Sequence, residues 1–225
     1  YKEPFQMKLK LFGNRELFDA YFAQQGGGLS WAAALYSPMT KEVFAYKMKD
    51  REQMVSSIIH ETSHRVFGEY IPSGPPWLNE GLADYFAMSR ASGNSVVISP
   101  DYNHDKVVRS LLRSKQLPDL NTHLRLNLQQ WQANHTVNYP IAWSLVYFLM
   151  SSSKGKILIQ KMLYQLVYKR KEPFDSVVII DKNYPGGIKL FERDWHASIE
   201  KRKSSQSFTS DVRRRAKFEI IPVDY

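Results

Sequence analysis

Residues 55–70 are VSSIIHETSHRVFGEY, a stretch that places two histidines four positions apart with a glutamate directly after the first. On a helix, residues four apart project from the same face, so His60 and His64 can present two imidazole nitrogens to one ion. Glu61 is rotated by about 100° from His60, which puts its carboxylate beside such an ion rather than on it. The stretch therefore predicts either a metal-binding helix with an adjacent base or an amphipathic helix that merely carries two histidines.

The sequence around this stretch favours a helix. Asp50 can cap its first turn, Glu52 follows close behind, and Gly68 is a plausible stop signal. Apolar residues recur at helical spacing and are expected to form a buried stripe. They are Met54, Ile58, Ile59 and Val66.

A second helical period, WLNEGLADYFAMSRAS, follows the turn IPSGPP and is expected to end near Gly93. Glu80 lies near its start and can come back antiparallel to the first helix, where it would supply an oxygen ligand. Two histidines and one glutamate leave a fourth position open, as a catalytic rather than a structural zinc site requires. Asp84 lies one turn further on, either decorating the surface or accepting the outer N–H of a ligating histidine, for which His60 is the expected partner.

The two-part motif HETSH (60–64) and WLNEGLADYF (77–86) resembles that of the gluzincin zinc metallopeptidases of clan MA, especially the small bacterial peptidase-MA-like domains. The resemblance runs from a hairpin near Trp31 to a helix that ends near Met150. It implies a thermolysin-like catalytic core that binds one zinc ion. By this resemblance the zinc ligands are His60, His64 and Glu80, the general base is Glu61, and Asp84 supports a ligand.

The segment NYPIAWSLVYFL (138–149) extends this resemblance, because gluzincin aminopeptidases carry a tyrosine before the matching helix. Tyr139 is the matching position and would donate a hydrogen bond to the oxyanion that develops during hydrolysis. Two alternatives stay open: Tyr139 is an aromatic packed before Pro140, or His135 is the donor, as in thermolysin-like relatives.

Gluzincins also present an edge strand upstream of the zinc helix, against which the substrate backbone binds as an added strand. SWAAALYS is the matching stretch, and its small side chains would permit close approach. No acidic residue lies between Ser30 and Thr40, whereas aminopeptidases of this type carry a glutamate there for the substrate amine. We therefore expect an endopeptidase rather than an aminopeptidase. The predicted substrate strand comprises Trp31, Ala32, Ala33 and Ala34.

The rest of the chain predicts an α+β fold, with a small N-terminal mixed sheet followed by a mainly helical part. A strand over 5–12, a helix over 14–25 and a hairpin that turns at SPMTK precede the metal-binding stretch. We predict a single zincin-like unit, divided into sheet and zinc-binding helices (1–93), a helical subdomain (94–203) and a basic tail (204–225). Within the helical part, a short extended piece over 95–102 precedes helices over 104–115, 124–134, 141–153, 155–171 and 190–203.

Composition limits the classes of partner. The 225 residues contain no cysteine, so any metal must be held by His, Asp or Glu. The net charge is +9, but the excess is concentrated in KRKSSQSF and DVRRRAKF near the C-terminus, which is typical of a solvated tail rather than a nucleic-acid groove. No apolar run is long enough to span a bilayer. We expect a peptide or protein substrate, no nucleic acid and no transmembrane segment.

These observations lead to one functional expectation and one alternative. The expectation is a zinc-dependent peptidase in which Glu61 acts as general base on a metal-activated water. The alternative is a non-catalytic, zinc-stabilised module that binds peptides or cell-envelope partners along the same edge strand. Since the chain begins at Tyr1 without a methionine or signal peptide, we expect a fragment or mature form. The resemblance favours the periplasm or secretion.

Overall fold

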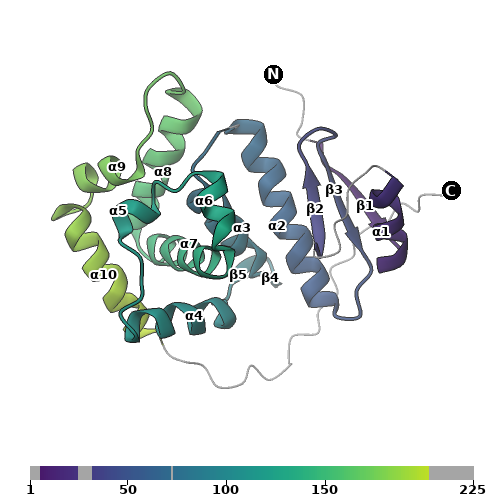
Figure 1. The fold of residues 1–225 in the computed structure, drawn as a ribbon, viewed down its shortest axis with the longest axis horizontal. Coiled ribbons are helices and arrows are strands. Elements are labelled where there is room, and N and C mark those ends of the chain that lie inside the picture. The colour runs from purple at the N-terminus through teal and green to yellow at the C-terminus, as the bar shows by residue number, and fades with distance from the viewer. Residues whose placement is uncertain (1–5, 25–31, 72, 203–225) are drawn as a thin grey trace.

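The computed structural model describes residues 6–24, 32–71 and 73–202. A three-stranded sheet stands beside a mainly helical body, and one long helix, α2 (Arg51–Tyr70), runs between them (Figure 1). The α+β fold with a small N-terminal sheet and a helical C-terminal part is therefore confirmed. The division at residues 93 and 203 stays a prediction, and both the basic tail over 204–225 and Trp31 lie outside the described residues.

The sheet has the order β1-β3-β2, in which β1 (Lys8–Phe12) runs parallel to β3 (Glu42–Tyr46) and β2 (Ala34–Ser37) runs antiparallel to it. The predicted hairpin is thus confirmed, and β2 is an edge strand among the described residues. Helix α1 (Arg15–Gln24) covers the face of the sheet that points away from α2 (Figure 1). Four phenylalanines form the core beneath it, namely Phe12, Phe18, Phe22 and Phe44.

Helix α2 begins where the sequence predicts. The Asp50 side chain accepts hydrogen bonds from the backbone N–H groups of Glu52 and Gln53, which satisfies two donors that the first helical turn leaves unpaired. Helix α3 (Pro76–Ala87) begins at a proline, a residue whose missing N–H costs nothing in the first turn. The short connection brings α3 back against α2, as expected for a helical hairpin.

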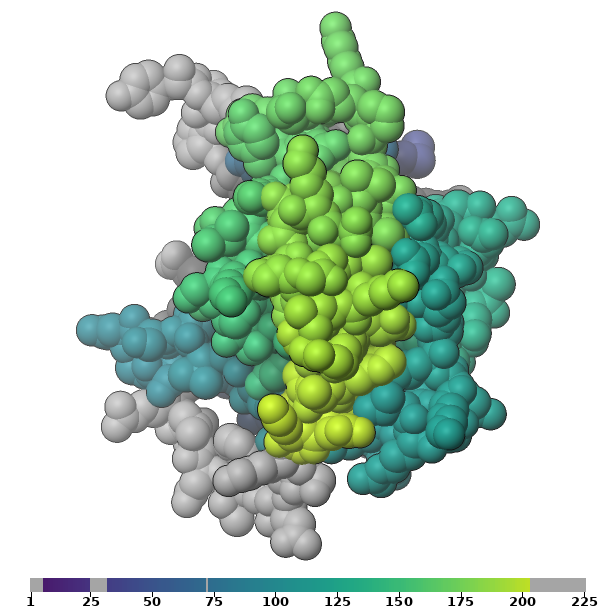
Figure 2. Space-filling view, turned by 90° about the vertical axis from the view of Figure 1, so that its left-hand side faces the viewer, coloured from purple at the N-terminus to yellow at the C-terminus, as the bar shows by residue number. Residues whose placement is uncertain are grey.

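The helical body is built around α7 (His135–Met150), whose residues 141–146 are all buried. Figure 2 shows α10 (Gly187–Lys201) lying over the side of the molecule that faces away from the sheet. The core of this body includes Trp77 and Leu78 of α3 together with residues of α7, so these two helices share one hydrophobic cluster. The other helices are α4 (Tyr102–Arg113), α5 (Leu120–His123), α6 (Leu128–Ala133), α8 (Ser153–Tyr168) and α9 (Ser176–Asn183).

Several predicted boundaries are wrong. Helix α3 ends at Ala87 rather than near Gly93, because residues 89–98 pair as an antiparallel hairpin of β4 (Ser89–Ser92) and β5 (Ser95–Ile98). Helix α6 begins after residue 127, where an asparagine forms a capping box with Gln130. Helix α7 begins six residues earlier than predicted and continues through its internal proline.

The predicted buried stripe of α2 is wrong at one position. Val66 is 42% exposed, whereas Met54, Ile58 and Ile59 are partly buried. Val66 follows His64 by about 200° around the helix, so it points away from the side on which the histidines meet α3. The helix buries only those faces that contact its neighbours.

A glycine determines how closely α3 approaches α7. A methyl group at Gly81 would lie 2.6 Å from the Ala142 carbonyl oxygen and 2.8 Å from Val146 Cγ2. We expect Gly81→Ala to lower the free energy of unfolding by up to about 2 kcal/mol, since overpacking costs about 1–3 kcal/mol and helix propensity returns about 1 kcal/mol. Urea unfolding measures this. The matched control is Gly68→Ala on α2, where the added carbon meets Tyr36 at 3.7 Å; equal effects of the two changes would contradict the prediction.

A buried histidine in α5 predicts acid sensitivity. His123 is 2% exposed, neither ring nitrogen has a hydrogen-bond partner among the described residues, and burial lowers its pKa to about 4. The unfolded chain therefore binds a proton at a higher pH than the folded chain does. The free energy of unfolding therefore carries no penalty from His123 above pH 6.5. It decreases by up to about 3 kcal/mol as the pH falls from 6.5 towards 4.

We expect His123→Leu to reduce this loss, since leucine fills the site beside Trp131 without binding a proton. Urea unfolding at pH 7.5 and pH 4.5, with chelator present in every sample, measures the difference between wild type and variant. An unchanged pH dependence in the variant would show that other groups cause the acid sensitivity.

No helix among the described residues is both long and apolar enough to cross a membrane.

Candidate metal centre

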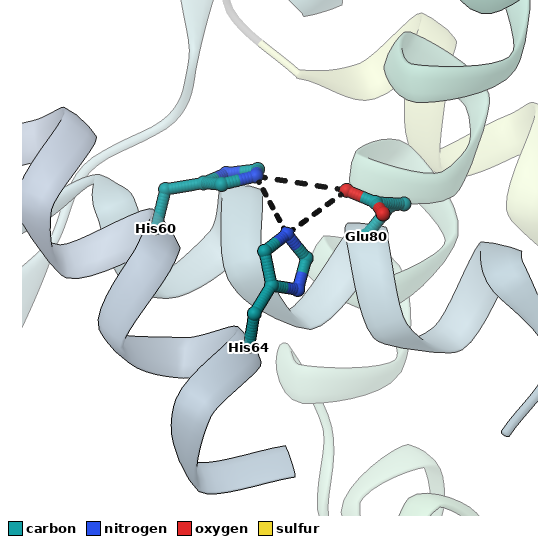
Figure 3. A group of neighbouring side chains, drawn as sticks. All are labelled: His60, His64 and Glu80. Carbon is teal, nitrogen blue, oxygen red and sulfur yellow. Dashed lines mark hydrogen bonds and ion pairs between the residues drawn. The ribbon is translucent and has the colours of Figure 1, made fainter. Parts of the chain in front are cut away.

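Three side chains converge between α2 and α3 (Figure 3). His60 and His64 project from α2, and Glu80 comes from α3 to meet them. The two Nε2 atoms lie 3.0 Å apart, and Glu80 Oε2 lies 3.6 Å from the His60 Nε2 and 3.3 Å from the His64 Nε2. This cluster could hold a metal ion.

The spacing of these atoms fits a tetrahedral ion. Ligand atoms bound tetrahedrally to zinc at about 2.0–2.1 Å lie about 3.3–3.4 Å apart. The three observed separations, 3.0, 3.3 and 3.6 Å, bracket that value. Glu80 Oε2 is buried, and the two imidazole nitrogens lie at ion-pair distance from it, as expected of an oxygen placed among metal ligands.

The outer nitrogens of both imidazoles have acceptors. His60 Nδ1 lies 2.9 Å from Asp84 Oδ1, so Asp84 stands where the sequence predicts. His64 Nδ1 lies 3.1 Å from Asn79 Oδ1. A proton held on each Nδ1 leaves a lone pair on each Nε2, which is the tautomer that binds a metal.

Asn79 is a residue that the sequence analysis missed. The available signal was its position directly before Glu80 on the same helix, where an amide oxygen can reach a histidine of the facing helix. Asparagine is a common cap and turn residue, and only the crossing of α2 and α3 shows which histidine it meets.

The electrostatics of the cluster favour a cation. Burial opposes charge on His60, but Asp84 and Glu80 outweigh it and raise the pKa of His60 to about 10. Burial likewise opposes ionisation of Glu80, but His60 and His64 lower its pKa to about 2. The carboxylates of Glu80 and Asp84 thus favour positive charge on the imidazoles, at the position where the ligand atoms meet. A bound metal ion would displace the imidazole protons that carry this charge.

Glu61 lies beside the cluster rather than in it, as predicted. Its Oε2 accepts a hydrogen bond from the backbone N–H of Tyr36 in β2, at 2.7 Å. Burial raises the pKa of Glu61 above its ordinary value, and the charges of His60 and His64 offset only part of this increase. A buried carboxylate whose pKa lies above its ordinary value is suited to accept and return a proton.

A cleft of about 280 Å³ adjoins His60 and Glu61. Ala32, Ala33 and Ala34, the described part of the predicted substrate strand, line one wall. The regular strand begins only at Ala34, so the pairing edge lies closer to Tyr36 than predicted. The cleft is also lined by Ser56, Ser57, Asp84, Ala87, Met88 and Asp101.

Of the two candidate oxyanion donors, Tyr139 is the one that lies close enough to the cluster to interact with Glu80 and Asp84. It is partly buried in α7, and burial together with the charges of Glu80 and Asp84 raises its pKa well above the ordinary value. His135, at the first residue of α7, is exposed. Tyr139 also packs against Trp131 at 5.8 Å between ring centroids, so its packing role is real as well.

Comparison with known proteins places this site within a family. A family model described as a protein of unknown function, DUF1570, matches residues 54–175, which is more than half of the chain. The chain belongs to the DUF1570 family. No curated protein sequence matches it at a significant level.

The DUF1570 match covers every side chain of the metal cluster, its two outer partners and Tyr139. It begins within α2 and therefore leaves out β2 and the wall of the cleft formed by Ala32–Ala34. The family description names no activity, so the resemblance to gluzincins stays a prediction.

Proposed function

We propose that this DUF1570 protein is a zinc-dependent peptidase that cleaves within peptide chains. The observation that carries the proposal is the convergence of His60, His64 and Glu80, with the buried carboxylate of Glu61 next to them at the end of a cleft. Two imidazoles and one carboxylate form the ligand set typical of catalytic zinc, which leaves a coordination position free.

A zinc ion bound here would supply Lewis-acid activation of a water molecule and of a carbonyl group. Glu61 would take the proton that this water loses as its oxygen attacks the carbonyl carbon. It would then deliver the proton to the amine as the C–N bond breaks. The Tyr36 N–H bonds only Oε2, so Oε1 of the same carboxylate is the oxygen that would exchange this proton.

Two further parts of the chain would position the substrate. Tyr139 would donate its hydroxyl proton in a hydrogen bond to the oxyanion, since a tyrosine hydroxyl is protonated at neutral pH. The outer edge of β2, apart from the Tyr36 N–H that already donates to Glu61, would pair with an extended substrate backbone. The small side chains of Ala32–Ala34 permit that approach.

Action within the chain rather than at a free N-terminus is favoured by the walls of the cleft. The described part of β2 and the residues before it contribute alanines and no carboxylate. Asp84 and Asp101 do line the cleft, but Asp84 Oδ1 lies 2.9 Å from His60 Nδ1, and Asp101 Oδ1 already accepts the backbone N–H groups of Asn103 and His104. N-acetylated peptides are therefore expected to be cleaved at least as well as peptides with a free amine.

The test combines metal analysis with cleavage of a peptide library that contains free and N-acetylated members. The proposal expects one zinc ion per chain and cleavage that a chelator abolishes and added zinc restores. Bound zinc without chelator-sensitive cleavage would support the zinc-stabilised binding module instead. Bound iron would contradict the proposal, because two histidines and a carboxylate also hold iron in oxygenases.

A further inference from the structure

Two buried polar atoms without hydrogen-bond partners face each other behind the metal cluster. Asp84 uses Oδ1 for His60, while its Oδ2 is buried and has no hydrogen-bond partner among the described residues. His104 Nδ1, in the first turn of α4, is likewise buried and without such a partner. These two atoms lie 3.9 Å apart.

The surroundings of His104 hold it at this place. Asp101 accepts the backbone N–H of His104 at 3.0 Å, and the Asp101 Oδ2 lies 3.4 Å from the His104 Nδ1. On the other side, the ring of His104 lies 6.0 Å from the ring of Trp143, a fully buried residue of α7. The imidazole is thus confined between two carboxylates and an indole.

We propose that His104 is a positioning residue of the metal site, acting through Asp84 on His60. An approach of about 1 Å would bring its Nδ1–H within hydrogen-bonding distance of Asp84 Oδ2, so that each carboxylate oxygen of Asp84 holds one imidazole. The carboxylate would then be fixed in the orientation that keeps the proton of His60 on Nδ1 and its Nε2 free for the ion. The inference rests on the proposed metal site.

Leaving both atoms unpaired would be costly. A buried polar atom without a partner destabilises the fold, and here two such atoms are within reach of each other. Their pairing would also connect α4 to His60 on α2 through Asp84. The N-cap residue of α4, Asp101, lines the cleft. Asp101 Oδ2 also lies near the His104 Nδ1, at 3.4 Å, but that nitrogen makes no hydrogen bond to any described residue and is therefore available to Asp84.

The test compares zinc affinity in three variants by competition with a chromophoric chelator. Outer hydrogen-bond partners of metal ligands contribute about 10- to 100-fold in affinity. Since His104 acts one residue further out, we expect His104→Leu to weaken zinc binding about 10-fold. His104→Gln can still donate a hydrogen bond to Asp84 and should restore most of that loss. His196→Leu on α10 is the matched control and should bind zinc like the wild type.

The melting temperature of the zinc-free variants separates positioning from folding. The proposal expects both zinc-free variants to stay folded, with His104→Leu melting somewhat below His104→Gln because Asp84 Oδ2 stays unpaired, and it expects the two to differ in zinc affinity. It is overturned if His104→Leu binds zinc as tightly as the wild type, or if both variants lose affinity and stability together. Zinc binding that depends on His104 in a protein without peptidase activity would refute the proposed function and keep this inference. Peptidase activity in a protein whose zinc affinity does not change with His104 would refute this inference and keep the proposed function.

Discussion

The Glu61→Gln variant is expected to keep one zinc ion per chain while hydrolysing peptides about 100- to 10,000-fold more slowly than the wild type. Glutamine has nearly the same shape and can still accept the N–H of Tyr36 through its side-chain oxygen, so the end of the cleft should keep its structure. It cannot take a proton from water at neutral pH. Single-substrate kinetics and metal analysis of the same preparation measure both quantities.

The matched control for this variant is Glu52→Gln, which makes the same chemical change on the same helix. Glu52 is exposed in the first turn of α2 and does not line the cleft. We expect its activity to equal that of the wild type. A Glu61→Gln protein that keeps more than a tenth of the wild-type rate would rule out Glu61 as the general base.

The second large effect is expected from loss of a ligand. His64→Ala removes one of three protein ligands, and its zinc affinity should fall by more than the roughly 10- to 100-fold that follows loss of an outer partner. The variant should also lose the stabilisation that zinc gives the folded chain. At a zinc concentration 100 times the dissociation constant this amounts to about 2.7 kcal/mol, or a rise in melting temperature of roughly 5–10 °C for a domain of this size.

Thermal melts with and without zinc, together with competition titration, measure both effects. His196→Ala is the control, because it removes a histidine of α10 that does not line the cleft. If zinc raises the melting temperature of His64→Ala as much as that of the wild type, the ion binds elsewhere and the assignment of the centre is wrong.

Much of the centre could be predicted from the sequence because its geometry is local. The spacing of His60 and His64 fixes them on one helical face, and Asp84 lies one turn from Glu80 for the same reason. The connection between α2 and α3 is short and contains prolines, so α3 is expected to return antiparallel beside α2. The Asp50 cap and the hairpin of β2 and β3 follow from equally local signals.

The interactions that the sequence did not predict join residues from separate elements. Asn79 meets His64 only because of the way α3 crosses α2. Tyr36 donates its N–H to Glu61 across 25 positions, and His104 Nδ1, on a different helix, lies 3.9 Å from Asp84 Oδ2. A backbone N–H carries no residue-specific signal at all, so the Tyr36 contact could not be predicted from residue types.

The sequence by itself determined which side chains can act as ligands, base and support, since helical periodicity places residues three and four apart on one face. Only the tertiary structure decided the separations of 3.0, 3.3 and 3.6 Å between ligand atoms, because these depend on the packing of α3 between α2 and α7. Gly81 permits that packing by leaving no side chain between α3 and the backbone of α7. Periodicity fixes direction along one helix, whereas distance between helices is set by the side chains that separate them.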